Sequence, residues 1–165
     1  MSKRSEALAD RLVQGATALE NFAAALTQDE WEMRTPKDGR KIGVIVNHVA
    51  TVYPLEIEFA QMVARGEAVT DLTANVVNKM NAEHAKANDG VTKEQTLELL
   101  HQNSTAAAAA IRALSDAELD QAVPVTLYGG ATVTCQFVLE DHAVRHSYHH
   151  LARLRSAVQS VVRAA

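Results

Sequence analysis

The sequence has little cysteine, and this scarcity excludes two ways of stabilising a small protein. Cys135 is the only cysteine among the 165 residues, so no internal disulfide can form and no cysteine-rich zinc site exists. We interpret Cys135 as small core filler, because a reactive thiol needs exposure and a lowered pKa. A chain without disulfides suits a reducing compartment, and we therefore expect the protein to be cytoplasmic.

Concentrated positive charge and long apolar runs are also missing. The 16 Lys and Arg residues are scattered and the formal net charge is −4, whereas a nucleic-acid surface normally needs a basic patch. No segment approaches the roughly 20 apolar residues of a membrane span, and the first residues lack the apolar core of a signal peptide. We expect neither nucleic acid nor a membrane as a partner.

What the sequence does have is apolar residues, many of them alanine, at helical spacing. Apolar positions repeat every three or four residues over 4–26 and 42–66, after residue 92, and over 133–163. This period is typical of amphipathic helices. Four such helices in a chain of this length predict a single all-α domain over residues 1–165, a four-helix bundle.

Local signals describe the segments between the long helices. Thr27 and Glu30 form a capping box for a short helix, and another short helix is expected within 67–90. Pro54 cannot donate to the carbonyl four residues before it, so we expect a kink in the second long helix. The β-branched residues on both sides of Gly129-Gly130 predict a small β-hairpin before the last helix.

Four of the seven histidines lie in one nine-residue stretch, HAVRHSYHH, over 142–150. Neutral imidazole is the commonest metal ligand, and residues four apart share one face of a helix. His142/His146 and His146/His150 are therefore both candidate pairs. A helical wheel at about 100° per residue places His146 and His150 toward the core, and His142 and His149 toward solvent or a helix interface.

An independent histidine lies on the apolar face of the helix over 42–66. His48 falls in the middle of that face. A lone core histidine is usually structural and hydrogen-bonded to a neighbour, but this core must also hold His146 and His150. Because buried polar groups need partners, three inward histidines predict a site for one divalent metal ion.

Other ionisable residues are weaker candidates for the site. His84 ends the apolar face of the expected short helix and is a candidate ligand, water anchor or acid/base group; the alternative is a half-buried surface histidine. His101 is interpreted as a surface or half-buried histidine. Glu140 falls on the inner side of the last helix and could support a histidine, whereas Glu56 and Glu58 are expected to be solvated.

Three stretches together resemble the DinB/YfiT-like superfamily: DGRKIGVIVNHVATVYPLEIEFAQMVARGE, the later MNAEHA, and the terminal HAVRHSYHHLARLRSAV. That superfamily includes the metal-binding domain of mycothiol-dependent maleylpyruvate isomerase. Its pattern is one histidine early in the second helix and H-x-x-x-H late in the fourth, which matches His48, His146 and His150. The family's frequent H-H-x-G-Q continuation is absent, since Leu-Ala-Arg follows the two histidines.

The resemblance implies an up-down-down-up bundle, often a homodimer, that binds zinc or nickel with water at the open positions. Some branches resemble thiol-S-transferases that use bacillithiol, mycothiol or a related small thiol. A thiol-S-transferase acting on a small-molecule substrate is therefore the first expectation. His84 is the candidate for proton transfer.

The ligand set itself favours an enzyme, because three neutral ligands leave at least one position on the metal open. With a water molecule as nucleophile, the protein would be a metal-dependent hydrolase. A non-enzymatic alternative is a metal that staples the bundle of a stress-response or dimeric interaction module. The sequence contains no G-x-S-x-G elbow or phosphate loop that would indicate another chemistry.

Overall fold

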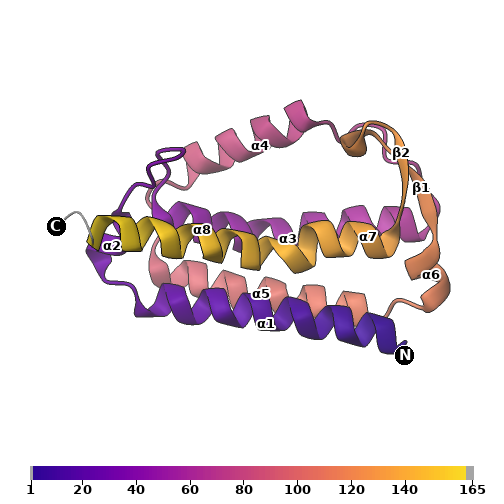
Figure 1. Ribbon diagram of the computed structural model, residues 1–165, viewed down its shortest axis with the longest axis horizontal. Helices are drawn as coiled ribbons and strands as arrows, with labels where there is room; N and C mark the ends of the chain where they lie inside the picture. Colours follow the sequence, from indigo (N-terminus) through magenta and orange to yellow (C-terminus); the bar gives the residue numbers. More distant parts are fainter. Residues whose placement is uncertain (1, 163–165) are drawn as a thin grey trace.

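Four long helices form the bundle that the apolar spacing predicts (Figure 1). The computed structural model describes residues 2–162, with side chains to residue 160. α1 and α8 run in one direction and α3 and α5 in the other, so the up-down-down-up order is confirmed. α1 packs against α5 and α8, and α3 packs against α5 and the last helical segments. The long helices are α1 Lys3–Ala25, α3 Ile42–Ala64, α5 Lys93–Arg112 and α8 Arg145–Val162.

Because α3 and α5 run in the same direction, the chain must return along the bundle between them. α4 Ala74–Ala87 makes this return and lies along the outside of the long helices (Figure 1). The structure describes α4 in full, and none of its residues is buried, although Val76, Val77 and Met80 are apolar. α4 therefore contributes little to the core.

The expected short elements connect the long helices. The capping box at Thr27 and Glu30 is present at the start of α2. The small hairpin is confirmed, since β1 and β2 pair antiparallel, and Gly129 and Gly130 both have positive φ in the connection. The short elements in chain order are α2 Gln28–Glu32, α6 Asp116–Asp120, β1 Ala122–Val125, the 3-10 turn η1 Thr126–Tyr128 and β2 Ala131–Thr134.

One continuous apolar core lies between the long helices. Leu12, Ile45, Leu100 and Leu154 of the predicted faces are fully buried in it, whereas Leu55, on the predicted apolar face of α3, is 45% exposed. Cys135 is fully buried as well, which confirms it as core filler, and burial raises the pKa of its thiol to about 11. None of the described helices is long and apolar enough to cross a membrane.

The last helix differs from the single element predicted over 133–163. α7 Cys135–Leu139 is followed by a π-helical turn, η2 Glu140–Val144, and only then by α8. Residues 133 and 134 belong to β2, and residue 163 lies outside the described residues. A π turn closes its hydrogen bonds over five residues instead of four, so it shifts the faces of α7 and α8 relative to each other. A helical wheel with a constant angle per residue therefore gives wrong side-chain directions across this segment.

α3 continues through Pro54 because a side chain from α5 replaces the missing backbone donor. Pro54 has no N–H for the carbonyl of Ala50, and Asn103 Nδ2 donates to that buried carbonyl oxygen at 2.8 Å. An unpaired buried acceptor would cost about 1–3 kcal/mol. Asn103 thus allows the helix to pass the proline, and the kink expected there stays a prediction.

We expect Asn103→Ala to lower the free energy of unfolding by about 1–2 kcal/mol. In a Pro54→Ala background the backbone N–H of residue 54 returns to the Ala50 carbonyl, so the same change should cost much less. Chemical denaturation of the four proteins in a double-mutant cycle measures the difference. Equal costs in both backgrounds would show that Asn103 does not replace the missing donor.

Candidate metal centre

Three histidines from two helices meet at one point in the core. His48 lies in α3, and His146 and His150 lie one turn apart in α8. His48 is 5% exposed and His150 is 7% exposed, while His146 is half-buried. One ring nitrogen of each lies within 4.8 Å of the other two. The structure thus brings together the three residues that the sequence predicts as ligands.

The ring nitrogens of this cluster have few hydrogen-bond partners. His48 Nε2 and His146 Nε2 lie 3.2 Å apart, and the stacked rings of His146 and His150 have centroids 4.8 Å apart. His48 Nδ1 and His150 Nδ1 are buried and have no partner among the described residues. His48 Nε2 and His146 Nε2 face each other, and neutral imidazoles that converge in this way offer lone pairs that a metal ion accepts. The donor set therefore fits a divalent metal ion.

Burial keeps two of the imidazoles in the neutral form that binds metals. Burial, followed by the neighbouring His146, lowers the pKa of His48 to about 3. Burial is again the largest cause for His150, whose pKa is lowered to about 2, with smaller effects of His146 and His48. Both rings are therefore uncharged near neutral pH, and each has a nitrogen lone pair to offer.

Glu56 belongs to this cluster, and the prediction that it is solvated is wrong. Glu56 is 7% exposed, and its Oε1 accepts a hydrogen bond from His146 Nδ1 at 2.5 Å. With its proton on Nδ1, His146 directs the lone pair of Nε2 toward His48. A signal for this role exists in the sequence: His48, Val52 and Glu56 are spaced four residues apart, so they share one line along α3.

His142 lies in the π turn and faces α3 beside the same carboxylate. Its Nδ1 is 4.0 Å from Glu56 Oε1, and its side chain is 24% exposed. Its ring packs edge-on against Phe59, with centroids 5.3 Å apart, and its buried Nε2 has no partner within the described part of the chain. His142 thus lies at a helix interface, one of its two expected positions, and His149 is exposed as expected.

A buried hydrogen bond links α3 to α8 beside the cluster. Tyr53 Oη and Ser147 Oγ lie 2.5 Å apart, and both residues are fully buried. Ser147 directly follows His146 in the chain. The bond therefore helps to hold the two histidines of α8 against the one of α3.

His84 on α4 lies beside His48 at the edge of the cluster, with ring centroids 5.5 Å apart. His84 Nε2 donates to Asn47 Oδ1 at 3.0 Å, and Asn47 Nδ2 donates in turn to Thr96 Oγ1 at 3.2 Å. His84 Nδ1 is then the acceptor nitrogen, and no described residue pairs with it. Burial, followed by the charge of Arg40, lowers the pKa of His84. The ring is therefore neutral near neutral pH, and the lone pair on Nδ1 is free.

The remaining ionisable candidates lie away from the cluster. Glu140 does not support a histidine: it lies at the surface, where Arg11 Nη1 donates to its Oε1 at 3.2 Å. The prediction fails because Glu140 is in the π turn, where the wheel angle changes. His101 is exposed, 3.9 Å from Glu20, and Glu58 is exposed as expected.

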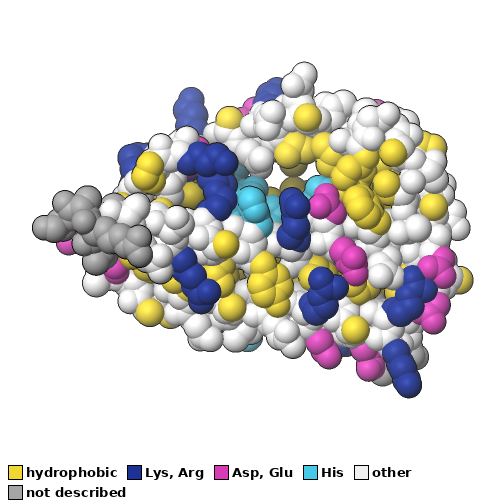
Figure 2. Space-filling view, in the orientation of Figure 1, with side chains coloured by type: hydrophobic (Ala, Val, Ile, Leu, Met, Phe, Trp, Pro, Cys, Tyr) yellow, Lys and Arg dark blue, Asp and Glu magenta, His cyan; other side chains and the backbone are white. Residues whose placement is uncertain are grey.

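A hollow between α4 and α8 leads to the histidines. Figure 2 shows histidine side chains in cyan at the bottom of this hollow, with apolar side chains along one side of it. The cavity has a volume of about 140 Å³, and His48, His146, His142 and Glu56 contribute to its wall. A small molecule in the cavity would contact two of the three clustered histidines. The apolar part of the wall consists of Val52, Leu55, Phe59, Leu72, Val77, Met80 and Leu127.

The molecule is thus an up-down-down-up four-helix bundle whose three-histidine cluster could hold a metal ion. The family model of the mycothiol maleylpyruvate isomerase N-terminal domain matches residues 12–144. The chain belongs to that family, within the DinB/YfiT-like superfamily. The matched residues include His48 and end before His146 and His150. Among curated proteins, none matches the sequence.

Solved structures of this superfamily share the fold. YfiT from Bacillus subtilis, described as a probable metal-dependent hydrolase, is 15% identical, with a TM-score of 0.77 over 98% of this chain and 90% of that one. The mycothiol-dependent maleylpyruvate isomerase is 15% identical, with a TM-score of 0.71 over 93% and 63%. A DinB-like protein from Bacillus subtilis is 16% identical, with a TM-score of 0.61 over 93% and 91%. At these identities the likeness establishes the fold alone.

In the metal-free protein, we expect His150→Leu to keep the free energy of unfolding unchanged or to raise it by about 1–2 kcal/mol. The reason is that leucine removes an unpartnered buried nitrogen. Urea denaturation in the presence of a chelator measures the change, with His149→Leu at the exposed neighbouring position as the control. A loss of more than about 1 kcal/mol would support the alternative of an ordinary structural histidine.

Proposed function

We propose that the protein is a metal-dependent enzyme that binds one divalent ion, zinc or nickel, through His48, His146 and His150. The observation that carries the proposal is the convergence of three imidazoles beside a cavity that reaches the surface. Structural zinc sites are closed by four protein ligands, whereas catalytic sites keep a position open. Within the described residues the cluster offers three ligands, which favours catalysis.

The reaction that we propose is transfer of a low-molecular-weight thiol, such as bacillithiol or mycothiol, to an electrophilic small molecule. A metal ion at the cluster would lower the pKa of a thiol bound to it. The thiol sulfur forms a bond to an electrophilic carbon, the bond from this carbon to its leaving group breaks, and the thiol proton passes to a base. His84 Nδ1 is our candidate for that base, because Asn47 already occupies Nε2.

Glu56 acts as a positioning residue in this scheme. By accepting the proton of His146 Nδ1, it holds the ring with Nε2 toward His48 and makes the ring a more basic ligand. The hydrogen bond between Tyr53 and Ser147 supports the same arrangement, because it holds α8 against α3. The apolar part of the cavity wall limits the access of water to the reacting sulfur.

The comparisons support thiol chemistry in general terms. The matched family and one of the structural neighbours both have mycothiol in their names. This chain spans 63% of the isomerase, so the isomerase's own reaction is not transferred to it. The proposal takes from these relatives only the use of a small thiol by a metal-binding bundle.

Hydrolysis is the second candidate function, and one feature of the site favours it. Glu56 Oε2 is buried and has no hydrogen-bond partner among the residues described, and Glu56 contributes to the cavity wall. This oxygen could accept a proton from a water molecule. YfiT is described as a probable metal-dependent hydrolase, and the two candidate reactions differ only in whether water or a thiol is the nucleophile.

A non-enzymatic alternative is a stress-response or interaction module in which the metal stabilises the helix bundle. The apolar core extends along all four long helices, well beyond the histidines. We therefore propose that the fold does not need the metal. The homodimer expected from the family resemblance is also a proposal, and static light scattering tests it.

We expect Glu56→Gln to weaken metal binding by about 10–100-fold, because the carboxylate that orients His146 is lost. Calorimetric titration of the metal-free protein with zinc measures the affinity. Glu58→Gln is the matched control, since Glu58 lies two residues away and is exposed, and its affinity should equal that of the wild type. Equal affinities of the two variants would contradict the role assigned to Glu56.

Removal of the metal should abolish turnover and leave the helices intact. The assay combines a panel of electrophiles with glutathione, bacillithiol or mycothiol, and circular dichroism follows the helical content. Added zinc or nickel should restore turnover of the wild type, and His150→Ala should stay inactive while folded. Equal turnover of His150→Ala and the wild type would exclude metal catalysis. If the protein unfolds when the metal is removed by a chelator, the result would instead favour a structural role of the metal.

A further inference from the structure

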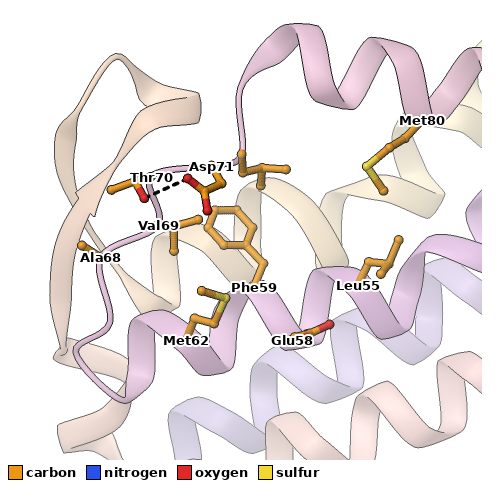
Figure 3. Close-up of a pocket in the computed structure, with 10 residues that line it drawn as sticks. Leu55, Glu58, Phe59, Met62, Ala68, Val69, Thr70, Asp71 and Met80 are labelled. Atoms are coloured by element: carbon orange, nitrogen blue, oxygen red, sulfur yellow. Dashed lines mark hydrogen bonds between the residues drawn. The ribbon is translucent and has the colours of Figure 1, made fainter.

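Exposed apolar side chains face each other between α3 and α4. Leu55 of α3 is 45% exposed, and Met80 of α4 is 42% exposed. Figure 3 shows these two side chains pointing toward one another from their helices, with the ring of Phe59 farther along α3. An amphipathic helix normally buries its apolar side, but α4 buries none of its residues. The apolar side of α4 therefore borders open space rather than packed protein.

This space joins the histidine cavity to a second cavity. The second cavity has a volume of about 310 Å³ and extends past Met62 to the loop after α3, residues 68–72 (Figure 3). We call the two cavities together the α3–α4 groove. Its inner end reaches His48 and His146, and its outer end lies at the surface. The two cavities have four wall residues in common: Leu55, Phe59, Leu72 and Met80.

The ionisable side chains of the groove are acidic or histidine. Glu58 and Asp71 line the outer cavity, and Glu56 lines the inner one. In the part of the chain that the structure describes, no Lys or Arg lines either cavity. At the outer end, a bound anion would meet the carboxylates of Glu58 and Asp71 and would have no Lys or Arg side chain to pair with. Small dicarboxylates are therefore unsuited to the groove, whereas uncharged apolar molecules suit it.

The size and flexibility of the groove suit a small molecule. Cavities of about 310 and 140 Å³ together fall within the usual range of small-molecule sites, about 300–1,000 Å³. Met62 and Met80 lie at its wall, and the flexible thioether side chain adapts to ligands of different shape. Because the inner end reaches the histidine cluster, a molecule that fills the groove would have one end at the reacting position.

We propose that the α3–α4 groove binds the apolar body of the electrophilic substrate, and that this substrate carries no negative charge. The inference rests on the proposed function for the reaction at the histidines, but binding in the groove needs neither metal nor thiol. Leu55 and Met80 provide affinity for the apolar body, and Glu58 and Asp71 exclude anions. The electrophilic carbon lies at the inner end, beside the histidine cluster.

Two fluorescent probes with one skeleton test this selectivity. 1-Anilinonaphthalene is neutral, its 8-sulfonate derivative is an anion, and both fluoresce more strongly in apolar surroundings. In titrations of the metal-free protein, the neutral probe should bind about 10-fold more tightly than the sulfonate. Leu55→Glu should weaken binding of the neutral probe by about 10-fold. Phe137→Glu is the matched control, because Phe137 has the same 45% exposure and lies outside the groove.

A charge-reversal variant separates charge selectivity from the greater hydrophobicity of the neutral probe. Glu58 and Asp71 are both exposed, so Glu58→Lys combined with Asp71→Lys should fold normally by circular dichroism. It should tighten binding of the sulfonate by about 10-fold and leave the neutral probe unchanged. Unchanged sulfonate affinity, or wild-type binding of the neutral probe by Leu55→Glu, overturns the proposal. A dimer that Leu55→Glu dissociates, seen by light scattering, also overturns it, since a second copy would then fill the groove.

Turnover with a matched pair of electrophiles distinguishes this inference from the proposed function. 1-Chloro-2,4-dinitrobenzene is neutral, and 4-chloro-3,5-dinitrobenzoate is an anion with the same chloride leaving group; each rate is divided by the uncatalysed rate of that compound. Probe binding as expected with no thiol transfer to either compound would contradict the proposed reaction and leave the groove assignment in place. Thiol transfer to the two compounds at equal rates would support the reaction and overturn the groove assignment.

Discussion

The convergence of two buried imidazoles and one half-buried imidazole at one point of the core is the constraint on which the rest of the site depends. His48 and His150 are too deeply buried to be charged near neutral pH, and each has a ring nitrogen without a partner among the described residues. A core selected for packing alone would exclude such groups. A metal ion that accepts lone pairs where the three rings converge would account for the burial of these imidazoles, and the bond from His146 Nδ1 to Glu56 leaves the lone pair of His146 Nε2 facing His48 Nε2.

The topology of the bundle determines what surrounds this point. Because α3 and α5 are parallel, the chain must return along the bundle, and α4 makes this return outside the long helices (Figure 1). α4 places His84 beside His48 and Met80 opposite Leu55 (Figure 3). It does so without burying its own side chains, so a groove remains beneath it. The crossover therefore gives the histidines a wall on one side while keeping access for a small molecule.

Local sequence patterns predict the long helices, the hairpin and the clustered histidines. They fail where a residue distant in the sequence or an irregular turn determines the position of a side chain. His146 and His150 lie in α8, after the π turn, where the regular helical period holds. Glu140 lies within the π turn, so its predicted direction is wrong. Glu56 is missed for another reason: acidic residues are rarely buried without a partner, and its partner His146 comes 90 residues later. The exposure of the apolar side of α4 could not be predicted either, because apolar residues at helical spacing normally indicate a buried face.

The proposed chemistry assigns different charges to the two ends of the groove. Neutral imidazoles leave the charge of a bound divalent ion largely uncompensated, and Glu56 offsets part of it through His146. The inner end then favours an anionic sulfur over a neutral one. The outer end has Glu58 and Asp71 in its wall, so a second anion is disfavoured there. A thiol that ionises on binding and an electrophile that stays neutral therefore suit opposite ends, and neither can take the place of the other.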